Sequence, residues 1–506
     1  MTLFRASYEA QFRRWGLLVA FYSLPAWLTL TNVSVMDPDA WWHIRTGQWI
    51  IQHRSAPYND FFSTYGMGKP WFAYSWLFEI LIYALFSRFG LIGLVIYVYT
   101  LMLAIAGAFY SLVRKFETRL VHSIILAAAA LFALAHMRTP RPWLFTILFF
   151  AIELNILVSV RRTGNYRLLF YLAPLFALWA NLHIQFVYGL FVLGLALLDG
   201  PVNRLLRRQT SVERVGDRPL PVDKVSIALA ACLIATLLNP YHFRIYAVVL
   251  DTAKQSGLYQ LISELSPMDF RSLPDWLVLL LTLGAVFALG RRRSLNSFWF
   301  FLLSAGILIS FRSKRDVWLV TTIAITIIAL TRPVNKTRVD DRISKGQAAS
   351  VIVASIVMLG LAALTFRLSN PMLENFVAKD YPVAAASFIE QRGFPGPMYN
   401  YFDWGGYLIW RLPNLPVSID GRSNLHKAER IKHSWNVWNG HPDWSSDPEL
   451  SAARLVVAER ALPLTQLLRL DKRFDLVYED DIAVVFIRRD QKSAIRGMEY
   501  SKVLAH

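Results

Sequence analysis

Apolar residues in this chain of 506 residues fall in blocks of roughly 15–20 residues, the length that an α-helix needs to cross the core of a bilayer. Hydrophobic residues make up 55% of the sequence and charged residues 17%, whereas about 25% of an average soluble chain is charged. Trp and Tyr gather at the edges of the blocks, where amphipathic rings prefer the membrane interface. The sequence therefore predicts a polytopic α-helical membrane protein.

Block length and hydropathy predict about eleven membrane spans. The spans are expected at about 15–34, 91–113, 120–136, 143–160, 168–181, 185–199, 225–239, 275–290, 297–311, 317–331 and 348–366. The pair 168–181 and 185–199 is short, so a re-entrant hairpin is the alternative there. A further apolar helix over 74–87 is short and carries Glu79, and it is expected to lie along the outer surface.

The distribution of basic residues predicts the orientation. The first span follows Arg13 and Arg14, and no small-residue cleavage site comes after it, which favours a retained span over a signal peptide. Lys and Arg recur in every second link between spans, as in cytoplasmic loops. These links hold Arg114/Lys115/Arg119, Arg161/Arg162/Arg167, 200–224, Arg291/Arg292/Arg293 and 332–347.

This bias places the protein in the plasma (inner) membrane as a multi-pass chain with a cytoplasmic N-terminus. A transmembrane domain is predicted over 1–366, with an external loop at 37–90 that carries surface helices. Residues 367–506 are predicted to form an extracytoplasmic α/β domain, because charged residues return there and short strand-like runs alternate with helical ones. The runs are Pro416–Ile419, Arg454–Ala458 and Phe474–Tyr478, and a hairpin is expected around Asp480 and Asp481 that ends in Val484–Ile487.

The net charge of +18 does not indicate nucleic-acid binding, because much of the excess lies in the cytoplasmic links. The single cysteine, Cys232, lies inside an apolar block. It excludes a disulfide framework within the chain and a thiolate metal cluster.

Unusual polar residues collect in the links predicted to be external. Those links carry Asp37-Pro38-Asp39-Ala40-Trp41-Trp42-His43-Ile44-Arg45, Arg138-Thr139-Pro140-Arg141, Asn181-Leu182-His183, Asn239-Pro240-Tyr241, Glu264 and Arg312-Ser313-Lys314-Arg315-Asp316. The tail adds Asp403-Trp404-Gly405-Gly406-Tyr407 and Asp420-Gly421-Arg422. Each has a structural alternative. The paired acids are alternatively a solvated helix cap, and Asn-Pro and Gly-Gly are ordinary turns. Asn181 and His183 alternatively form hydrogen bonds between helices.

Arginines in short external links run against the positive-inside rule. Together with Lys314, these arginines, Arg138, Arg141, Arg312 and Arg315, are expected to meet an anion there. The anion is either lipid headgroups or a phosphate held by bidentate guanidinium groups. The carboxylates of Asp37, Asp39 and Glu264 suit Mg²⁺ or Mn²⁺, which prefer oxygen ligands. A general base at one aspartate is the alternative.

The order of these motifs resembles the GT-C superfamily of membrane glycosyltransferases, particularly the catalytic subunit of oligosaccharyltransferases. Asp37-Pro38 followed by aromatic residues and Arg45 is similar to that family's first external loop, and Leu261–Glu264 to its later motif ending in Glu. Tyr401–Tyr407 followed by Asp420 resembles the Trp-Trp-Asp-Tyr-Gly motif of the family's external domain. The chain lacks the family's acidic pair between the third and fourth spans and carries Tyr401-Phe402 where the family has Trp-Trp.

The resemblance implies a sugar donor on a polyprenyl phosphate or pyrophosphate, which enters from the outer membrane leaflet. Asp37, Asp39 and Glu264 would act as catalytic residues or bind a divalent cation, and the four arginines would hold the donor phosphate. The supporting residues would be Trp41, Trp42, His43, Arg45, Asn181 and His183. The acceptor side would be formed by Asp403, Trp404, Tyr407, Asp420 and Arg422.

Two other classes of protein fit parts of the pattern. A polytopic transporter of a lipid-linked or anionic substrate is one, although no internal repeat is present and the ionisable residues lie at span ends. A scaffold or sensor with an external domain is the other class, but it would not explain the outer Arg and Asp clusters. Within the enzyme class, transfer of one sugar and transfer of a whole glycan both remain open, as does the acceptor.

Overall fold

The computed structural model describes residues 2–31, 37–117, 119–205, 220–255, 257–291, 297–331, 345–365 and 367–491. The chain divides into two compact units. Unit 1 contains Met1–Ser34, Leu94–Phe243 and Ile262–Leu368, and unit 2 contains Val35–Gly93, Arg244–Leu261 and Ser369–His506. The units do not follow chain order, because unit 2 combines the predicted external loop with the tail.

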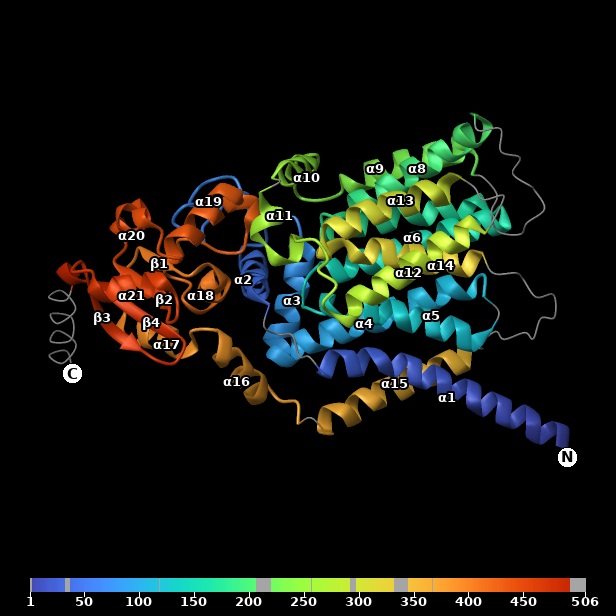
Figure 1. Ribbon diagram of the computed structural model, residues 1–506, viewed down its shortest axis with the longest axis horizontal. Helices are drawn as coiled ribbons and strands as arrows, with labels where there is room; N and C mark the ends of the chain where they lie inside the picture. The colour runs from blue at the N-terminus through green and yellow to red at the C-terminus, as the bar shows by residue number, and fades with distance from the viewer. Residues whose placement is uncertain are drawn as a thin grey trace. The chain divides into compact units, whose positions relative to one another are not determined.

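Unit 1 is a bundle of helices (Figure 1). A helix forms at each of the predicted spans: α1 (Thr2–Thr31), α4 (Leu91–Arg114), α5 (Leu120–Ala133), α6 (Trp143–Thr163), α7 (Leu172–Leu182), α8 (Phe186–Leu205), α9 (Val222–Thr236), α12 (Leu273–Gly290), α13 (Ser297–Arg312), α14 (Val317–Leu330) and α15 (Lys345–Thr365). Short helices and 3-10 turns link them: η1 (Ala135–Met137), η2 (Tyr166–Tyr171), η3 (Ser263–Leu265) and η4 (Lys314–Asp316).

The core of unit 1 lies around α14, which packs against α5, α12 and α13, and Figure 1 shows α5, α12 and α14 side by side. All but one of the α14 residues are buried. A helix that is apolar on every side is stable only when neighbouring helices or lipid surround it. Local signals set the helix ends, as at α6, where Gly164 takes a left-handed conformation with φ 71° and donates to the Val160 carbonyl oxygen at 2.8 Å.

By length and composition, four described helices can cross a membrane. They are α4, α6, α8 and α12, and the bent pair Ala349–Thr365 and Asn370–Asp380 makes a fifth if it is one span. The segments Leu120–Ala133, Tyr166–Leu182 and Ser297–Arg312 are apolar but shorter. The chain is thus an α-helical protein with several membrane-length helices, and about eleven crossings stays a prediction. Several basic links lie outside the described residues, at 206–219, 292–296 and 332–344.

Unit 2 contains a four-stranded sheet in the order β1-β2-β4-β3. Strand β1 (Met398–Asn400) is parallel to β2 (Leu455–Glu459), and β4 (Ala483–Arg488) is antiparallel to both β2 and β3 (Phe474–Glu479). The helices of the tail are α16 (Asn370–Asp380), α17 (Val383–Arg392), α18 (Gly405–Arg411), α19 (Ser423–Trp438), α20 (Pro448–Ala452) and α21 (Pro463–Leu470). One core cluster joins Val456 and Phe486 of the sheet to Trp438 of α19 and Leu468 of α21.

The predicted strands were confirmed with one exception. The hairpin β3–β4 turns at Asp480, whose backbone N–H donates to the Ala483 carbonyl oxygen at 3.0 Å, and β2 matches the run at 454–458. The strand predicted at Pro416–Ile419 was wrong. Val417 instead forms an isolated bridge with Ser63. Its backbone partners come from a loop that is far away in the sequence, so no local pattern predicts them.

Helices α2 (Pro38–His53) and α3 (Trp76–Phe89) also belong to unit 2, together with α10 (Arg244–Lys254) and α11 (Leu258–Leu261). Helix α3 confirms the apolar helix expected over 74–87. Within the unit, α2 packs against both α3 and α18. The loop helix that begins with the Asp-Pro motif is therefore part of the same compact body as the tail motifs.

Candidate active site

The Asp37-Pro38-Asp39 motif forms the N-terminus of α2. Asp37 caps the helix, and its Oδ1 accepts a hydrogen bond from the Asp39 backbone N–H at 3.0 Å. Pro38 occupies the first helical turn, where its fixed φ fits and no N–H is lost. Asp37 is buried, Asp39 is half-buried, and the helix N-terminus stabilises negative charge on both.

The tail motifs pack directly on this turn within unit 2. A Cβ atom added to Gly406 would lie 2.3 Å from the Pro38 carbonyl oxygen, and one added to Gly421 would lie 1.9 Å from Asp39 Oδ1. The rings of Trp41 and Tyr407 meet edge to face at 5.1 Å. The backbone atom in its way requires a glycine at 406, whereas at 421 an added methyl group would meet a side chain. The predicted acceptor-side motif therefore lies against the predicted catalytic motif.

Asp420 and Arg422 form a buried ion network. Arg422 Nη2 donates to Asp420 Oδ2 at 2.8 Å, and Arg422 Nη1 reaches Asp60 Oδ1 at 2.6 Å. His426 Nε2 lies 3.0 Å from Asp420 Oδ2. Burial alone would raise the pKa of Asp420, but Arg422 and His426 outweigh it and hold this pKa well below its usual range.

A second buried pair joins α2 to α3. His43 Nδ1 lies 3.1 Å from Glu79 Oε1, and Glu79 is only 1% exposed. Burial raises the pKa of Glu79 well above its ordinary value. The ring of Trp42 packs at a tilt against that of His43, with centroids 3.5 Å apart. Glu79 thus faces His43 in the interior of unit 2.

Unit 1 brings together Arg141, Glu264 and Arg315. Arg141 Nη2 donates to Glu264 Oε1 at 3.0 Å, and the Arg141 side chain is 12% exposed. The guanidinium carbons of Arg141 and Arg315 lie 5.0 and 5.7 Å from the centroid of the Trp143 ring. The face of an aromatic ring attracts cations, so both arginines make cation–π contacts with the Trp143 ring.

Buried polar atoms near these arginines lack partners among the described residues. Arg315 Nε and His183 Nε2 are such atoms. His183 Nδ1 lies 2.7 Å from Thr146 Oγ1, and both Arg141 and Arg315 act electrostatically on its ring. Buried polar groups normally have a hydrogen-bond partner, so these two atoms are candidates for contact with a ligand.

Other predicted site residues have structural partners. Arg138 donates to the carbonyl oxygens of Ala135 and Leu28, and Asn181 Nδ2 donates to those of Ala177 and Leu238 at 2.7 and 2.8 Å. Arg45 bonds Gln48 in the next turn of α2. Arg312 is exposed at the end of α13.

The remaining tail residues are held within unit 2. Trp404 Nε1 donates to the Asp380 carbonyl oxygen at 2.8 Å. Asp403 is exposed and accepts from the Tyr401 hydroxyl at 2.8 Å. These contacts fix the turn from which α18 begins.

The three acids predicted to bind a cation belong to different units. Asp37 and Asp39 lie in unit 2, whereas Glu264 lies in unit 1 and is paired with Arg141. Among the described residues, no group of three His, Cys, Asp or Glu side chains has the arrangement of a metal site. The residues of either unit alone do not fit a complete Mg²⁺ or Mn²⁺ site, so no chemical step is assigned to a metal.

Three residues that contact the candidate site residues were not predicted from the sequence. Asp60, His426 and Thr146 gave no local signal, because each stands in an ordinary loop, helix or span and acquires its role only through a distant partner. Glu79 was visible as an acid in an apolar helix. Its burial opposite His43 is what identifies it as a structural partner of α2.

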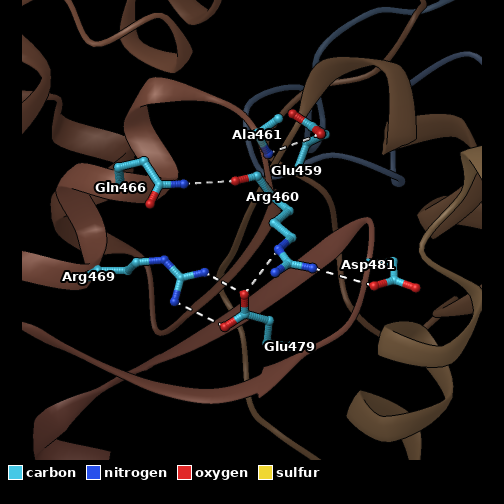
Figure 2. A pocket seen from close by; sticks show the side chains of 7 residues that line it. All are labelled: Glu459, Arg460, Ala461, Gln466, Arg469, Glu479 and Asp481. Atoms are coloured by element: carbon cyan, nitrogen blue, oxygen red, sulfur yellow. Dashed lines mark hydrogen bonds and ion pairs between the residues drawn. The ribbon is translucent and has the colours of Figure 1, made fainter.

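Figure 2 shows an open hollow of about 600 Å³ in the tail. Arg460 Nε and Arg469 Nη2 meet Glu479 Oε1 at 3.2 and 2.7 Å, and Arg460 Nη1 lies 3.5 Å from Asp481 Oδ1. These charges neutralise one another, and no predicted site residue lines the hollow. It does not contribute to the candidate active site.

Solved structures of an archaeal enzyme resemble this chain over most of its length. The oligosaccharyltransferase of Archaeoglobus fulgidus with a tethered acceptor peptide aligns over 90% of this chain and 70% of its own, with TM-score 0.55 and 11% identity. The chain shares the fold of this oligosaccharyltransferase. The archaeal enzyme AglB from the same organism, in complex with an inhibitory peptide and a dolichol-phosphate, aligns over 89% of this chain and 70% of its own, with TM-score 0.54 and 11% identity.

The GT-C likeness is one of fold. A third structure, the apo form of the archaeal oligosaccharyltransferase, gives TM-score 0.51 at 12% identity over 88% of this chain and 69% of its own. No protein-family model matches the sequence, and no curated protein sequence matches it. The predicted GT-C resemblance is thereby confirmed at the level of structure.

Proposed function

We propose that the chain is a membrane glycosyltransferase that moves a sugar or glycan from a polyprenyl-(pyro)phosphate donor to an acceptor on the extracytoplasmic side. The observation that carries the proposal is the Asp37-Pro38-Asp39 turn, which lies against the tail motifs in a chain with the GT-C fold. The dolichol-phosphate in the AglB complex supports a polyprenyl phosphate as the lipid carrier.

Unit 1 is proposed to bind the donor phosphate. Arg315 and Arg141, with the unpartnered Nε2 of His183, offer donors and positive charge beside Trp143. When the glycosidic bond to the phosphate breaks, the bonding electrons stay on the phosphate oxygen. Donors already in place stabilise that charge without the cost of rearranging solvent.

Unit 2 is proposed to activate the acceptor. The Asp39 carboxylate would accept the proton of the acceptor nucleophile as the new bond to the sugar forms. Asp37 is engaged as the helix cap and is assigned a positioning role. A divalent cation bound by the acids stays a separate prediction, tested below with a chelator.

The test is transfer by the purified full chain in detergent, with lipid-linked glycans extracted from membranes of its own host. Mass spectrometry compares wild type, Asp39→Asn and wild type with a chelator. Loss of donor and gain of product with wild type, but not with the folded Asp39→Asn variant, would establish the transferase. Unchanged activity with the chelator would exclude a required divalent cation.

A transporter is the second candidate, because of one observation. Glu153 lies in the membrane-length helix α6, is fully buried, and has no hydrogen-bond partner for either carboxyl oxygen in the described part of the chain. Acids inside spans are rare and often mark substrate or proton paths. If folded wild-type protein leaves the donor untouched in all lanes, uptake assays with Glu153→Gln become the decisive measurement.

A further inference from the structure

We propose that Gly421 is a positioning residue that sets the Asp39 carboxylate in its working orientation. This inference rests on the proposed function, in which Asp39 accepts the acceptor proton. It concerns a contact between two distant motifs that lie in the same compact unit.

The contact is unusually specific. A methyl group at position 421 would lie 1.9 Å from Asp39 Oδ1, 3.1 Å from Asp39 Cγ and 3.6 Å from Asp39 Oδ2. The three atoms nearest to the added carbon therefore all belong to one carboxylate. Heavy atoms cannot approach to 1.9 Å without a bond, so an alanine at 421 must move that carboxylate.

The backbone that carries Gly421 is held on both sides. Asp420 and Arg422 are fully buried and ion-paired to each other, and Arg422 is anchored again on Asp60. The Arg422 backbone N–H donates to Asp420 Oδ1 at 2.9 Å, and the Ser423 N–H donates to the Gly421 carbonyl oxygen at 2.8 Å. Because this segment is fixed, the smaller movement available is rotation of the Asp39 side chain.

The neighbouring glycines provide a contrast. Methyl groups at Gly405 and Gly406 would meet the carbonyl oxygens of Ile419 and Pro38 at 2.2 and 2.3 Å. Those atoms are backbone and cannot turn aside, so these two glycines serve packing. Gly421 differs because the atom in its way is the end of a side chain.

The experiment compares Gly421→Ala with wild type, Asp39→Asn and Gly194→Ala in the detergent transfer assay, using the full chain and the same extracted lipid-linked glycans. Gly194 in α8 is the matched control, since an added methyl meets no atom within 4 Å in the described residues. We expect kcat of Gly421→Ala to fall by about 100-fold, the effect of roughly 1 Å of misplacement at a reacting group, with KM for the donor unchanged. Gly194→Ala keeps wild-type kinetics.

A double-mutant cycle on thermal unfolding tests the contact without reference to activity. Any loss of Tm caused by Gly421→Ala should disappear in the Asp39→Ala background, because the obstructing carboxylate is gone. A loss that persists in the double variant means that the methyl group strikes something else, and the inference is then wrong.

The outcomes separate the two proposals. If wild type and Gly421→Ala are equally active while Asp39→Asn is inactive, the positioning role is wrong and the transferase proposal is still supported. A folded wild type that transfers nothing would remove the transferase and, with it, this inference.

Discussion

Arg315 carries a half-buried guanidinium whose Nε has no hydrogen-bond partner in the described chain. Its neighbour Lys314 donates from Nζ to Asp269 Oδ2 at 2.9 Å. The two cations are adjacent in sequence, yet it is Arg315 whose guanidinium carbon lies 5.7 Å from the centroid of the Trp143 ring and whose charge acts on His183. At the scale of single residues, hydrogen-bond satisfaction distinguishes a candidate ligand-binding cation from a surface ion pair.

Arg315→Ala is expected to weaken binding of a long-chain polyprenyl phosphate by about 10- to 100-fold, since a hydrogen bond to a charged group contributes about 1.5–3 kcal/mol. Titration of the detergent-solubilised chain with that lipid measures the affinity. Lys314→Ala is the matched control and should change affinity by less than about 1 kcal/mol, as for an exposed ion pair. Equal affinity of wild type and Arg315→Ala would contradict a phosphate role for this residue.

Glu79→Gln should retain nearly the wild-type Tm, whereas Glu79→Ala should lose about 1–3 kcal/mol of stability by leaving His43 without its partner. Burial raises the pKa of Glu79, so the folded protein holds a proton that the unfolded chain releases above its pKa of about 4.3. The contribution of Glu79 to the free energy of unfolding therefore falls as pH rises from the unfolded pKa towards the folded pKa. Unfolding curves across pH should show Glu79→Gln gaining on wild type at higher pH; equal losses for Gln and Ala would refute a neutral Glu79.

Helix α2 acquires its position from close contacts with two other elements of unit 2. Gly47 lies so near α3 that an added Cβ would be 1.9 Å from the Glu79 carbonyl oxygen, and Gly406 of α18 approaches Pro38 in the same way. The Asp60–Arg422–Asp420 network ties the loop at 37–90 to the tail. At the level of helices, the Asp37–Asp39 turn is held by backbone contact and buried charge, because short helices alone are marginally stable.

Acid should unfold unit 2 through Asp420. Its folded pKa lies below the unfolded value of about 3.9, so its stabilisation is present above that value and is lost as pH falls towards the folded pKa. Tm measured between pH 7 and pH 3 should drop at the acid end. Asp420→Asn should cost about 3–5 kcal/mol at neutral pH, because it leaves Arg422 with a broken buried pair.

The exposed Asp443, whose side chain is 82% accessible, is the control for that measurement. Asp443→Asn should leave both the Tm and its pH dependence unchanged, since surface ion pairs contribute little. A wild-type Tm that stays level down to pH 3, or Asp420→Asn as stable as Asp443→Asn, would show that the network is not a stability element.

For the whole molecule, orientation in the membrane is the property that decides where chemistry takes place. The basic links predict a cytoplasmic N-terminus and an external tail. At one such link, Arg161 Nη2 meets Asp199 Oδ2 at 2.9 Å, with both side chains fully buried. Some of the positive charge counted in the loops is therefore used inside the bundle, so the topology needs a direct test.

Single-cysteine labelling supplies that test. In a Cys232→Ser background, a membrane-impermeant maleimide should label Asp443→Cys in intact cells and label Thr163→Cys only after permeabilisation. Both positions are exposed, so access to the reagent depends on the side of the membrane. Labelling of Thr163→Cys in intact cells, with Asp443→Cys protected, would invert the proposed orientation.

Features that depend on neighbours along the chain could be predicted from the amino-acid sequence. Apolar block length predicted a helix at every span, and alternation around Asp480 predicted the β3–β4 hairpin, because hydrogen bonds and side-chain periodicity there are local. Tertiary structure alone decided the contacts between distant residues. Asp60 and Arg422 are 362 positions apart and Arg141 and Glu264 are 123 apart, and Gly421 meets Asp39 only because the tail and the external loop fold into one unit. No local pattern encodes such pairs, since their free energy arises only when the packed core brings them together.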